Sequence, residues 1–264
     1  MPPFQRELTL LTDTLRAAGR LALDIQARGP EVMIKADHTP VTTADLEING
    51  QLHAALLEAF PDDGWLSEES PDSASRLQSK RVWVVDPIDG TKYFIDRIPE
   101  YGISVALIEG GDVQVGALFN PATDELFTAV RGQGAWLNGA PIRVSSARRE
   151  RFLVFGAPPA MRRGRLKPLE SLVELKPMGS IAYTLAQVAA GKADATVNTS
   201  IMHEWDIAAG VLLVREAGGI VRDMRGAQFQ FNKPDAEVHG VVAGRPEAAP
   251  HFQTWLQAVQ PVRG

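Results

Sequence analysis

The chain has 264 residues, of which 45% are apolar, so it can bury one large core or two smaller ones. A formal net charge of -5 and a pI near 5.6 argue against a general nucleic-acid binder, and the absence of cysteine excludes disulfides and thiolate metal sites. With no signal peptide and no apolar run of about 18 residues, we expect a cytoplasmic protein that does not span a membrane.

The first predicted element is a long amphipathic helix. Apolar residues recur every three or four positions from Phe4 to Ile25, and Gly29-Pro30 ends the pattern. We therefore predict a helix over residues 4–28 that serves packing alone.

A second helix is predicted after the segment KADHTPVTTAD. Thr42 or Thr43 can cap its start. We expect three leucines of this helix to point into the core: Leu46, Leu52 and Leu56. Asp45 falls in the first turn, where its simplest role is to complement the helix dipole.

Two adjacent carboxylates, Glu68 and Glu69, follow in the segment WLSEES. On a strand, neighbouring side chains point to opposite faces. At most one of the two should then face a site, and the other interpretation is a solvated pair in a loop.

The segment RVWVVDPIDGT, residues 81–91, predicts a buried strand that delivers Asp86 and Asp89 to its end. Pro87 and Gly90 indicate a sharply shaped turn after the strand. Thr91 can open a short helix, with the amides of Gly90 and Thr91 facing an anion. The turn could thus present oxygen ligands to a hard cation and donors to a phosphate, or be an Asx-type turn without a metal.

From Tyr101 the pattern changes to β-rich runs joined at Gly110-Gly111 and Asn138-Gly139, which predicts an antiparallel meander. With the two leading helices it would form an α+β unit over residues 1–150 that holds most of the site.

Residues 151–264 alternate predicted helices, ending at Gly191 and Gly218, with short β-like runs, so we predict a second unit of α/β type. Asp206 lies at the start of the second of these helices. It can complement the helix dipole or face the Asp86 site across the boundary between the units.

Eight cationic side chains lie between Arg143 and Lys167, either as a solvated boundary or as contacts for a second anionic group. The histidines show no spacing typical of metal ligands and are interpreted as structural or exposed: His38, His53, His203, His239 and His251.

Five features in chain order, namely VTTAD, SEES, DPIDGT, the helix opened by Gly-Ser, and EWDIAAG with its trailing EAGG, resemble the inositol monophosphatase superfamily. Its members are magnesium-dependent, lithium-sensitive phosphomonoesterases. The resemblance spans roughly residues 35–245 and implies a layered αβαβα sandwich that combines α+β and α/β units. It also implies a small phosphorylated metabolite as the partner, with neither a nucleic-acid polymer nor a membrane, and a monomer or homodimer.

Carried over residue by residue, the resemblance implies that Glu68, Asp86 and the carbonyl of Ile88 hold one Mg²⁺. Asp86, Asp89 and Asp206 would hold a second, with a third ion allowed and Li⁺ expected to inhibit. Carboxylate and carbonyl oxygens are ligands that suit Mg²⁺.

The resemblance further implies that Asp45 and Thr91 orient and deprotonate the attacking water, with Glu68 taking part as a metal ligand. Glu69 would support the ligands from outside their shell. Substrate contacts are expected from four residues: Gly90, Thr91, Ser180 and Asn198.

Within the superfamily, KADHTPVTTAD, LSEES, DGTKYFI, HEWDIAAG and FNKPD are more similar to the CysQ branch, the 3'(2'),5'-bisphosphate nucleotidases, than to the inositol enzymes. We therefore expect adenosine 3',5'-bisphosphate as the substrate. Inositol 1-phosphate, histidinol phosphate and fructose 1,6-bisphosphate are the alternatives.

Two rival classes have different signatures. A haloacid-dehalogenase-type phosphatase uses an Asp nucleophile in a DxDxT motif, whereas two residues separate the acids of DPIDGT. A metabolite-binding module without catalysis would be expected to lose Asp45, Thr91 or a metal ligand, and each of these is present in the sequence.

Overall fold

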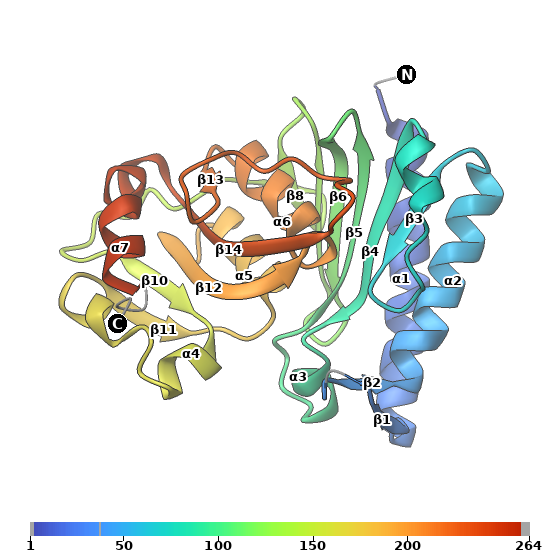
Figure 1. Cartoon of the computed structure of the whole chain (residues 1–264), viewed down its shortest axis with the longest axis horizontal. Helices are drawn as coiled ribbons and strands as arrows, with labels where there is room; N and C mark the ends of the chain where they lie inside the picture. Colours follow the sequence, from blue (N-terminus) through green and yellow to red (C-terminus); the bar gives the residue numbers. More distant parts are fainter. Residues whose placement is uncertain (1–2, 37, 260–264) are drawn as a thin grey trace.

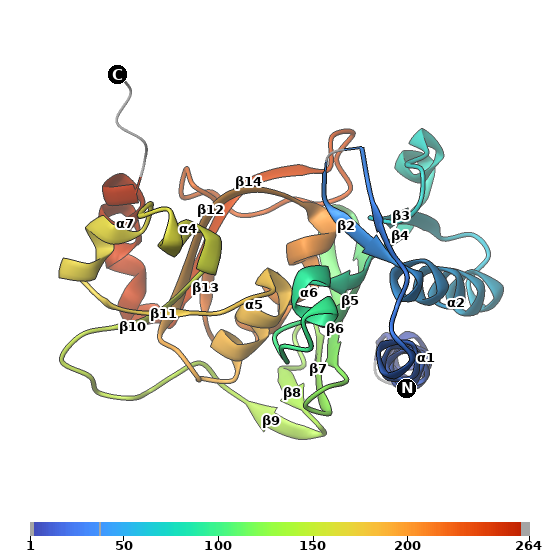
Figure 2. The ribbon, with the colours of Figure 1, turned by 90° about the horizontal axis from the view of Figure 1, so that it is seen from below.

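The computed structural model describes residues 3–36 and 38–259. Five layers follow one another across the molecule: a helix pair, a seven-stranded sheet, a second helix pair, a five-stranded sheet, and an outer group of short helices (Figures 1 and 2). The predicted layered αβαβα sandwich is confirmed.

The outer helix pair consists of α1 (Gln5–Arg28) and α2 (Thr43–Ala59), which pack on one face of the seven-stranded sheet (Figure 1). Both helices match the prediction, and Thr42 caps α2. The prediction for Leu46 is wrong, because this side chain is 44% exposed. The buried positions of α2 include Ala44, Ile48 and Leu52, and a residue two positions from Ala44 and from Ile48 lies on the opposite side of the helix.

Between these helices the chain forms a hairpin that the sequence did not predict. Strands β1 (Val32–Ile34) and β2 (Pro40–Thr42) pair antiparallel, with Met33 opposite Val41. The hairpin leads directly into the first turn of α2, so it lies beside Asp45.

The seven-stranded sheet has the order β3-β4-β5-β6-β7-β8-β9, with β3 parallel to β4 and every other pair antiparallel. The predicted meander is therefore confirmed. Its strands are β3 (Gly64–Ser67), β4 (Arg81–Asp89), β5 (Gly102–Glu109), β6 (Asp112–Asn120), β7 (Glu125–Val130), β8 (Ala135–Leu137) and β9 (Ala140–Ile142). The 3₁₀ helix η1 (Ala74–Gln78) lies between β3 and β4, and the short helix α3 (Thr91–Ile95) follows β4.

The five-stranded sheet has the order β11-β10-β12-β14-β13 and is mixed. Its strands are β10 (Leu153–Gly156), β11 (Glu174–Pro177), β12 (Ala195–His203), β13 (Ile220–Arg222) and β14 (Glu237–Gly244). Its outer elements are α4 (Pro158–Arg162), η2 (Lys167–Ser171), η3 (Pro246–His251) and α7 (Phe252–Val259).

Helices α5 (Ile181–Ala189) and α6 (Glu204–Glu216) form the central layer and contact both sheets (Figure 2). At Gly116 of β6, an added Cβ would lie 3.1 Å from the backbone of Ala209, so a glycine lets α6 lie directly on the sheet. One buried cluster includes residues from both sheets, and the predicted division at residue 150 stays a prediction. In the described part of the chain, none of the helices is long and apolar enough to cross a bilayer.

Candidate active site

The end of β4 holds the first two carboxylates through a bulge. Asp86 lies opposite Ser104 and Asp89 opposite Gly102 on β5, so β4 has one extra residue between these pairs. Pro87 lies inside this bulge, where a missing amide is tolerated. The strand thus continues to Asp89 instead of ending before Pro87, and the Asp86 Oδ1 atom accepts a hydrogen bond of 3.0 Å from the Ile88 amide.

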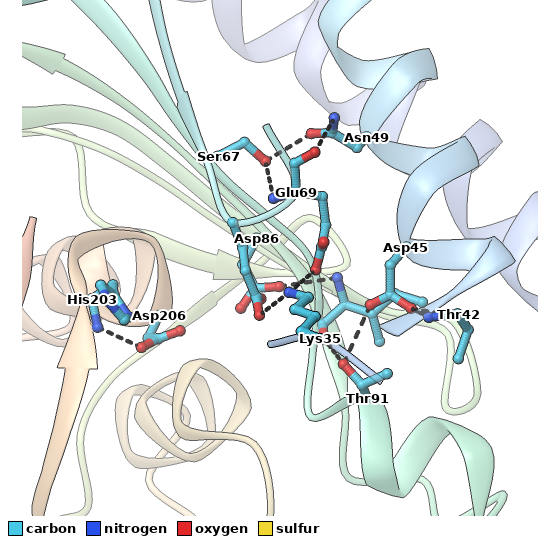
Figure 3. Close-up of polar contacts among 12 residues, drawn as sticks. Lys35, Thr42, Asp45, Asn49, Ser67, Glu69, Asp86, Thr91, His203 and Asp206 are labelled. Atoms are coloured by element: carbon cyan, nitrogen blue, oxygen red, sulfur yellow. Dashed lines mark hydrogen bonds and ion pairs between the residues drawn. The ribbon is translucent and has the colours of Figure 1, made fainter. Parts of the chain in front are cut away.

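The first turn of α6 brings a third carboxylate to the same place. Asp86, Asp89 and Asp206 each offer an oxygen, and these oxygens lie within 4.8 Å of one another. The Asp206 Oδ2 atom also accepts a 2.6 Å hydrogen bond from the His203 amide, so this residue caps its helix and lies in the cluster at once (Figure 3). The two interpretations of Asp206 are therefore compatible.

The three carboxylates strongly disfavour one another's charge. Burial raises the pKa of Asp86 and Asp206 well above the usual value, and the neighbouring carboxylates raise both further. Burial also raises the pKa of Asp89 to about 6, although hydrogen bonds from Ser180 and Ala182 oppose the shift. Three clustered carboxylates fit a hard divalent cation such as Mg²⁺, whose charge would remove this repulsion.

Beside the cluster, Asp45 and Thr91 form a hydrogen-bonded pair. The Thr91 hydroxyl lies 3.3 Å from Asp45 Oδ1 and 3.2 Å from the carbonyl of Ile88 (Figure 3). The other oxygen of Asp45 accepts hydrogen bonds from the amide and hydroxyl of Thr42, at 2.8 and 2.6 Å. Asp45 is 1% exposed, and burial raises its pKa to about 6 against these hydrogen bonds.

Glu68 and Glu69 differ from the prediction, because β3 ends at Ser67 and both residues lie in a turn. The alternation of side chains along a strand does not apply there, and both carboxylates converge on the Nζ atom of Lys35, at 2.9 and 2.5 Å. Burial alone would lower the pKa of Lys35, but the two carboxylates outweigh it and the net shift is upward. Lys35 is a functional candidate that the sequence did not reveal, since a lone lysine in a short hairpin gives no pattern.

A cavity of about 220 Å³ connects these groups. Its lining includes Glu68, the three clustered aspartates and the segment from Gly90 to Tyr93. Gly90 has φ 93°, and an added Cβ would lie 3.1 Å from the Cβ of Ser180, so the wall is tight at this point.

Two of the predicted substrate contacts have other partners in the structure. Ser180 is 3% exposed, donates a hydrogen bond to Asp89 and accepts one of 2.9 Å from the Tyr183 amide. Asn198 lies at an irregularity of β12 and accepts a 2.8 Å hydrogen bond from the Ser200 amide. Their contact with substrate stays a prediction, as does that of Gly90.

The structure separates the cations of residues 143–167 into two groups. Arg149 forms an ion pair of 3.3 Å with Asp194, and Arg151 donates to the carbonyls of Glu170 and Val173, so both hold the fold. Arg162 ends α4, and its charge lowers the pKa of Tyr93, whose net shift is upward because burial outweighs it. Tyr93 lines the cavity, whereas none of the cations of residues 143–167 is among its lining residues.

Comparisons with known proteins agree with this geometry. The sequence profile of the inositol monophosphatase family matches residues 8–260. An inositol-1-monophosphatase of Mesorhizobium japonicum is 37% identical over 84% of this chain and 86% of its own. A histidinol-phosphatase of Chlorobaculum parvum is 36% identical over 84% and 87%. The solved extragenic suppressor protein suhB of Bartonella henselae superposes with a TM-score of 0.85 at 32% identity, covering 96% of this chain and 99% of that one.

Proposed function

Since the chain belongs to the inositol monophosphatase family, we propose that it is a Mg²⁺-dependent phosphomonoesterase acting on a small phosphorylated metabolite. The observation that carries this proposal is the position of the Asp45–Thr91 pair beside the three clustered carboxylates. The carboxylate cluster can bind cations, and the Asp45–Thr91 pair can accept a proton. The attack of water on a phosphate ester requires both functions.

Glu68, Asp86, Asp89, Asp206 and the carbonyl of Ile88 would hold the metal. Bound Mg²⁺ would supply positive charge to the phosphate oxygens and the leaving oxygen as the ester bond breaks. Burial of the carboxylates keeps this interaction in a poorly solvated region, where it is strongest.

Thr91 and Asp45 would move the proton. The Thr91 hydroxyl can accept a hydrogen bond from the attacking water while it donates its own proton toward Asp45 Oδ1. As the water oxygen bonds to phosphorus and the ester P–O bond breaks, the water proton passes to Thr91 and the Thr91 proton passes to Asp45. The leaving oxygen takes its proton from solvent water. A pKa of about 6 suits Asp45 to this task near neutral pH, because the group is ionised yet still basic.

Inositol 1-phosphate is the first candidate substrate, because an inositol-1-monophosphatase is among the similar relatives. Adenosine 3',5'-bisphosphate, the substrate of the CysQ branch, is the second candidate. Lys92 lines the cavity, so a cation is available for a second phosphate. Histidinol phosphate, which has a cationic amine and no second phosphate, would gain no such contact from Lys92.

The test is phosphate release by the purified chain from these three esters and from fructose 1,6-bisphosphate, with Mg²⁺ and with EDTA. We expect release from at least one ester with Mg²⁺, none in EDTA, and partial inhibition by Li⁺. Release that is undiminished in EDTA would overturn the metal assignment. Inactivity on every ester, with Mg²⁺ bound, would favour a binding module.

A further inference from the structure

Arg76 carries a buried charge outside every recognised motif. The residue is 2% exposed and belongs to η1, between β3 and β4. Its Nε and Nη2 atoms bind both oxygens of Asp72 at 2.7 and 2.9 Å. Its Nη1 atom donates to Asn232 Oδ1 at 2.6 Å and its Nη2 atom to the Lys233 carbonyl at 2.9 Å. Arg76 thus holds the loop between β13 and β14. The sequence alone did not predict this contact.

Glu204 binds the same two loop residues. It is fully buried, and its two oxygens accept hydrogen bonds from the amides of Asn232 and Lys233 at 2.6 and 3.0 Å. Glu204 is the first residue of α6, two positions before Asp206. A guanidinium and a carboxylate therefore bind the same two loop residues, and the carboxylate belongs to the helix turn that carries Asp206.

Arg76 belongs to the connection between β3 and β4 that also carries Glu68. An added Cβ on Gly64 of β3 would lie 3.1 Å from the Arg76 Cα. Across the described residues, no strand of one sheet pairs with a strand of the other. The position of Asp206 relative to Glu68 and Asp86 therefore depends on the packing of α6 against the seven-stranded sheet and on side-chain contacts between the two halves.

We propose that Arg76 is a positioning residue that fixes Asp206 against the wall carrying Glu68, by way of Asn232, Lys233 and Glu204. The proposal rests on the metal site of the proposed function. An apolar contact would stabilise the fold at least as well, because burying charges has a large desolvation cost. The charged contact adds a defined orientation of its hydrogen-bond partners, because a planar guanidinium holds them in one plane.

The test is calorimetric titration of the substrate-free protein with MgCl₂. Arg76→Met should weaken Mg²⁺ binding by about tenfold, the lower end of the effect of residues that orient metal ligands. Arg81→Met is the matched control, because Arg81 makes a similar fork with Asp63 and an ion pair with Glu7, at the end of β4 remote from Asp86. Both variants should lower the melting temperature, but only Arg76→Met should lower the affinity.

A second variant covers the case in which Arg76→Met does not fold. Asn232 has φ 57°, which glycine tolerates, so Asn232→Gly removes one acceptor of Arg76 with little change in the backbone. It should weaken Mg²⁺ binding in the same direction, by at least about twofold. Unchanged affinity in Asn232→Gly or Arg76→Met, or equal losses in Arg76→Met and Arg81→Met, would overturn the role of Arg76. Failure of the wild-type chain to bind Mg²⁺ would instead overturn the metal site.

Discussion

The ammonium nitrogen of Lys35 lies 2.9 Å from a carboxylate oxygen of Glu68, a predicted metal ligand. A lysine of the β1–β2 hairpin therefore supplies to Glu68 the positive charge that a metal ion would supply. Lys35 and Mg²⁺ favour the same oxygens, so their charges oppose each other at this position.

The first prediction concerns this opposition. Lys35→Met should lower the melting temperature of the metal-free protein, because Glu68 and Glu69 lose their shared counter-charge. The same variant should bind Mg²⁺ more tightly, by about two- to fivefold, since the site becomes more negative by one charge. The checks are thermal melts in EDTA and calorimetry with MgCl₂. Lys80→Met is the control, because Lys80 makes a comparable 3.0 Å ion pair with Glu109 while 85% exposed. Weaker Mg²⁺ binding in Lys35→Met would mean that Lys35 orients the ligands instead of competing with the metal.

The second prediction is that Asp89→Asn nearly abolishes phosphate release. The variant removes one charge of the three-carboxylate cluster but keeps an acceptor for Ser180 and Ala182, so the protein should fold. Circular dichroism should be unchanged while turnover is lost. Asp124→Asn provides the control, since Asp124 is exposed and its positive φ of 51° is one that Asn adopts readily. An active Asp89→Asn protein would contradict the assigned ligand set.

The third prediction separates proton transfer from metal binding. Thr91→Ala should lower kcat by about 10²- to 10⁴-fold, because the hydroxyl between water and Asp45 is lost. Thr91→Ser should restore much of the rate, and Mg²⁺ affinity should change little in either variant. Steady-state kinetics and calorimetric titration with MgCl₂, on the same preparations, measure kcat and the Mg²⁺ affinity. If Mg²⁺ binding were lost together with kcat, Thr91 would belong to the metal site.

The fourth prediction concerns pH. Burial raises the pKa of Asp45 from 3.8 to about 6, so its contribution to stability is fully present below the unfolded pKa and is lost as pH rises through about 6. The metal-free protein should lose stability on going from about pH 4 to pH 7, by up to about 1.4 kcal/mol per pH unit for this one proton. Urea denaturation in EDTA measures the slope, which should be shallower in Asp45→Asn. Identical slopes in the two proteins would show that Asp45 titrates normally.

The fifth prediction concerns substrate choice. Lys92→Met should lower kcat/KM for adenosine 3',5'-bisphosphate by about tenfold, with a much smaller effect on inositol 1-phosphate, if the cavity rim binds a second phosphate. Lys176→Met, an exposed cation of β11, controls for net charge. Equal effects of Lys92→Met on both esters would remove the basis for a second phosphate site.

The parts of the site that could be predicted are those that a local pattern specifies. Asp86, Asp89 and Thr91 follow one buried strand within a few residues, and the structure places them around one cavity. Asp206 could be connected to them only through the family resemblance, because nothing in its own helix distinguishes a ligand from a capping residue.

The errors have local causes as well. Glu68 and Glu69 were assigned the alternation of a strand that ends one residue earlier. The hairpin β1–β2, the strand β11 and the helix α4 are too short to show a hydrophobic period. Helix α7 does show one, because Phe252, Trp255, Leu256 and Val259 are buried, and the prediction missed it. The contact of Arg76 with Asn232 joins residues 156 positions apart, and only the folded chain brings them together.

The choice of the CysQ branch shows a different limit. It rests on five short segments that together cover a small part of the chain. The similar relatives reported above are instead named inositol-1-monophosphatase, histidinol-phosphatase and suhB over most of the chain. The cavity that would receive the substrate has walls from separate parts of the sequence, since Glu68, Lys92 and Asp206 all line it.

Each half of the molecule has a buried cluster of its own, but helices α5 and α6 lie between the sheets and form a third cluster that the two halves share. A fragment ending at residue 150 would expose to water the apolar sheet face on which Ala209 and Leu212 pack. A fragment beginning at residue 151 would expose to water the face of α6 that packs on the seven-stranded sheet. We therefore expect each fragment to aggregate when expressed alone, and the intact chain to melt in a single cooperative transition.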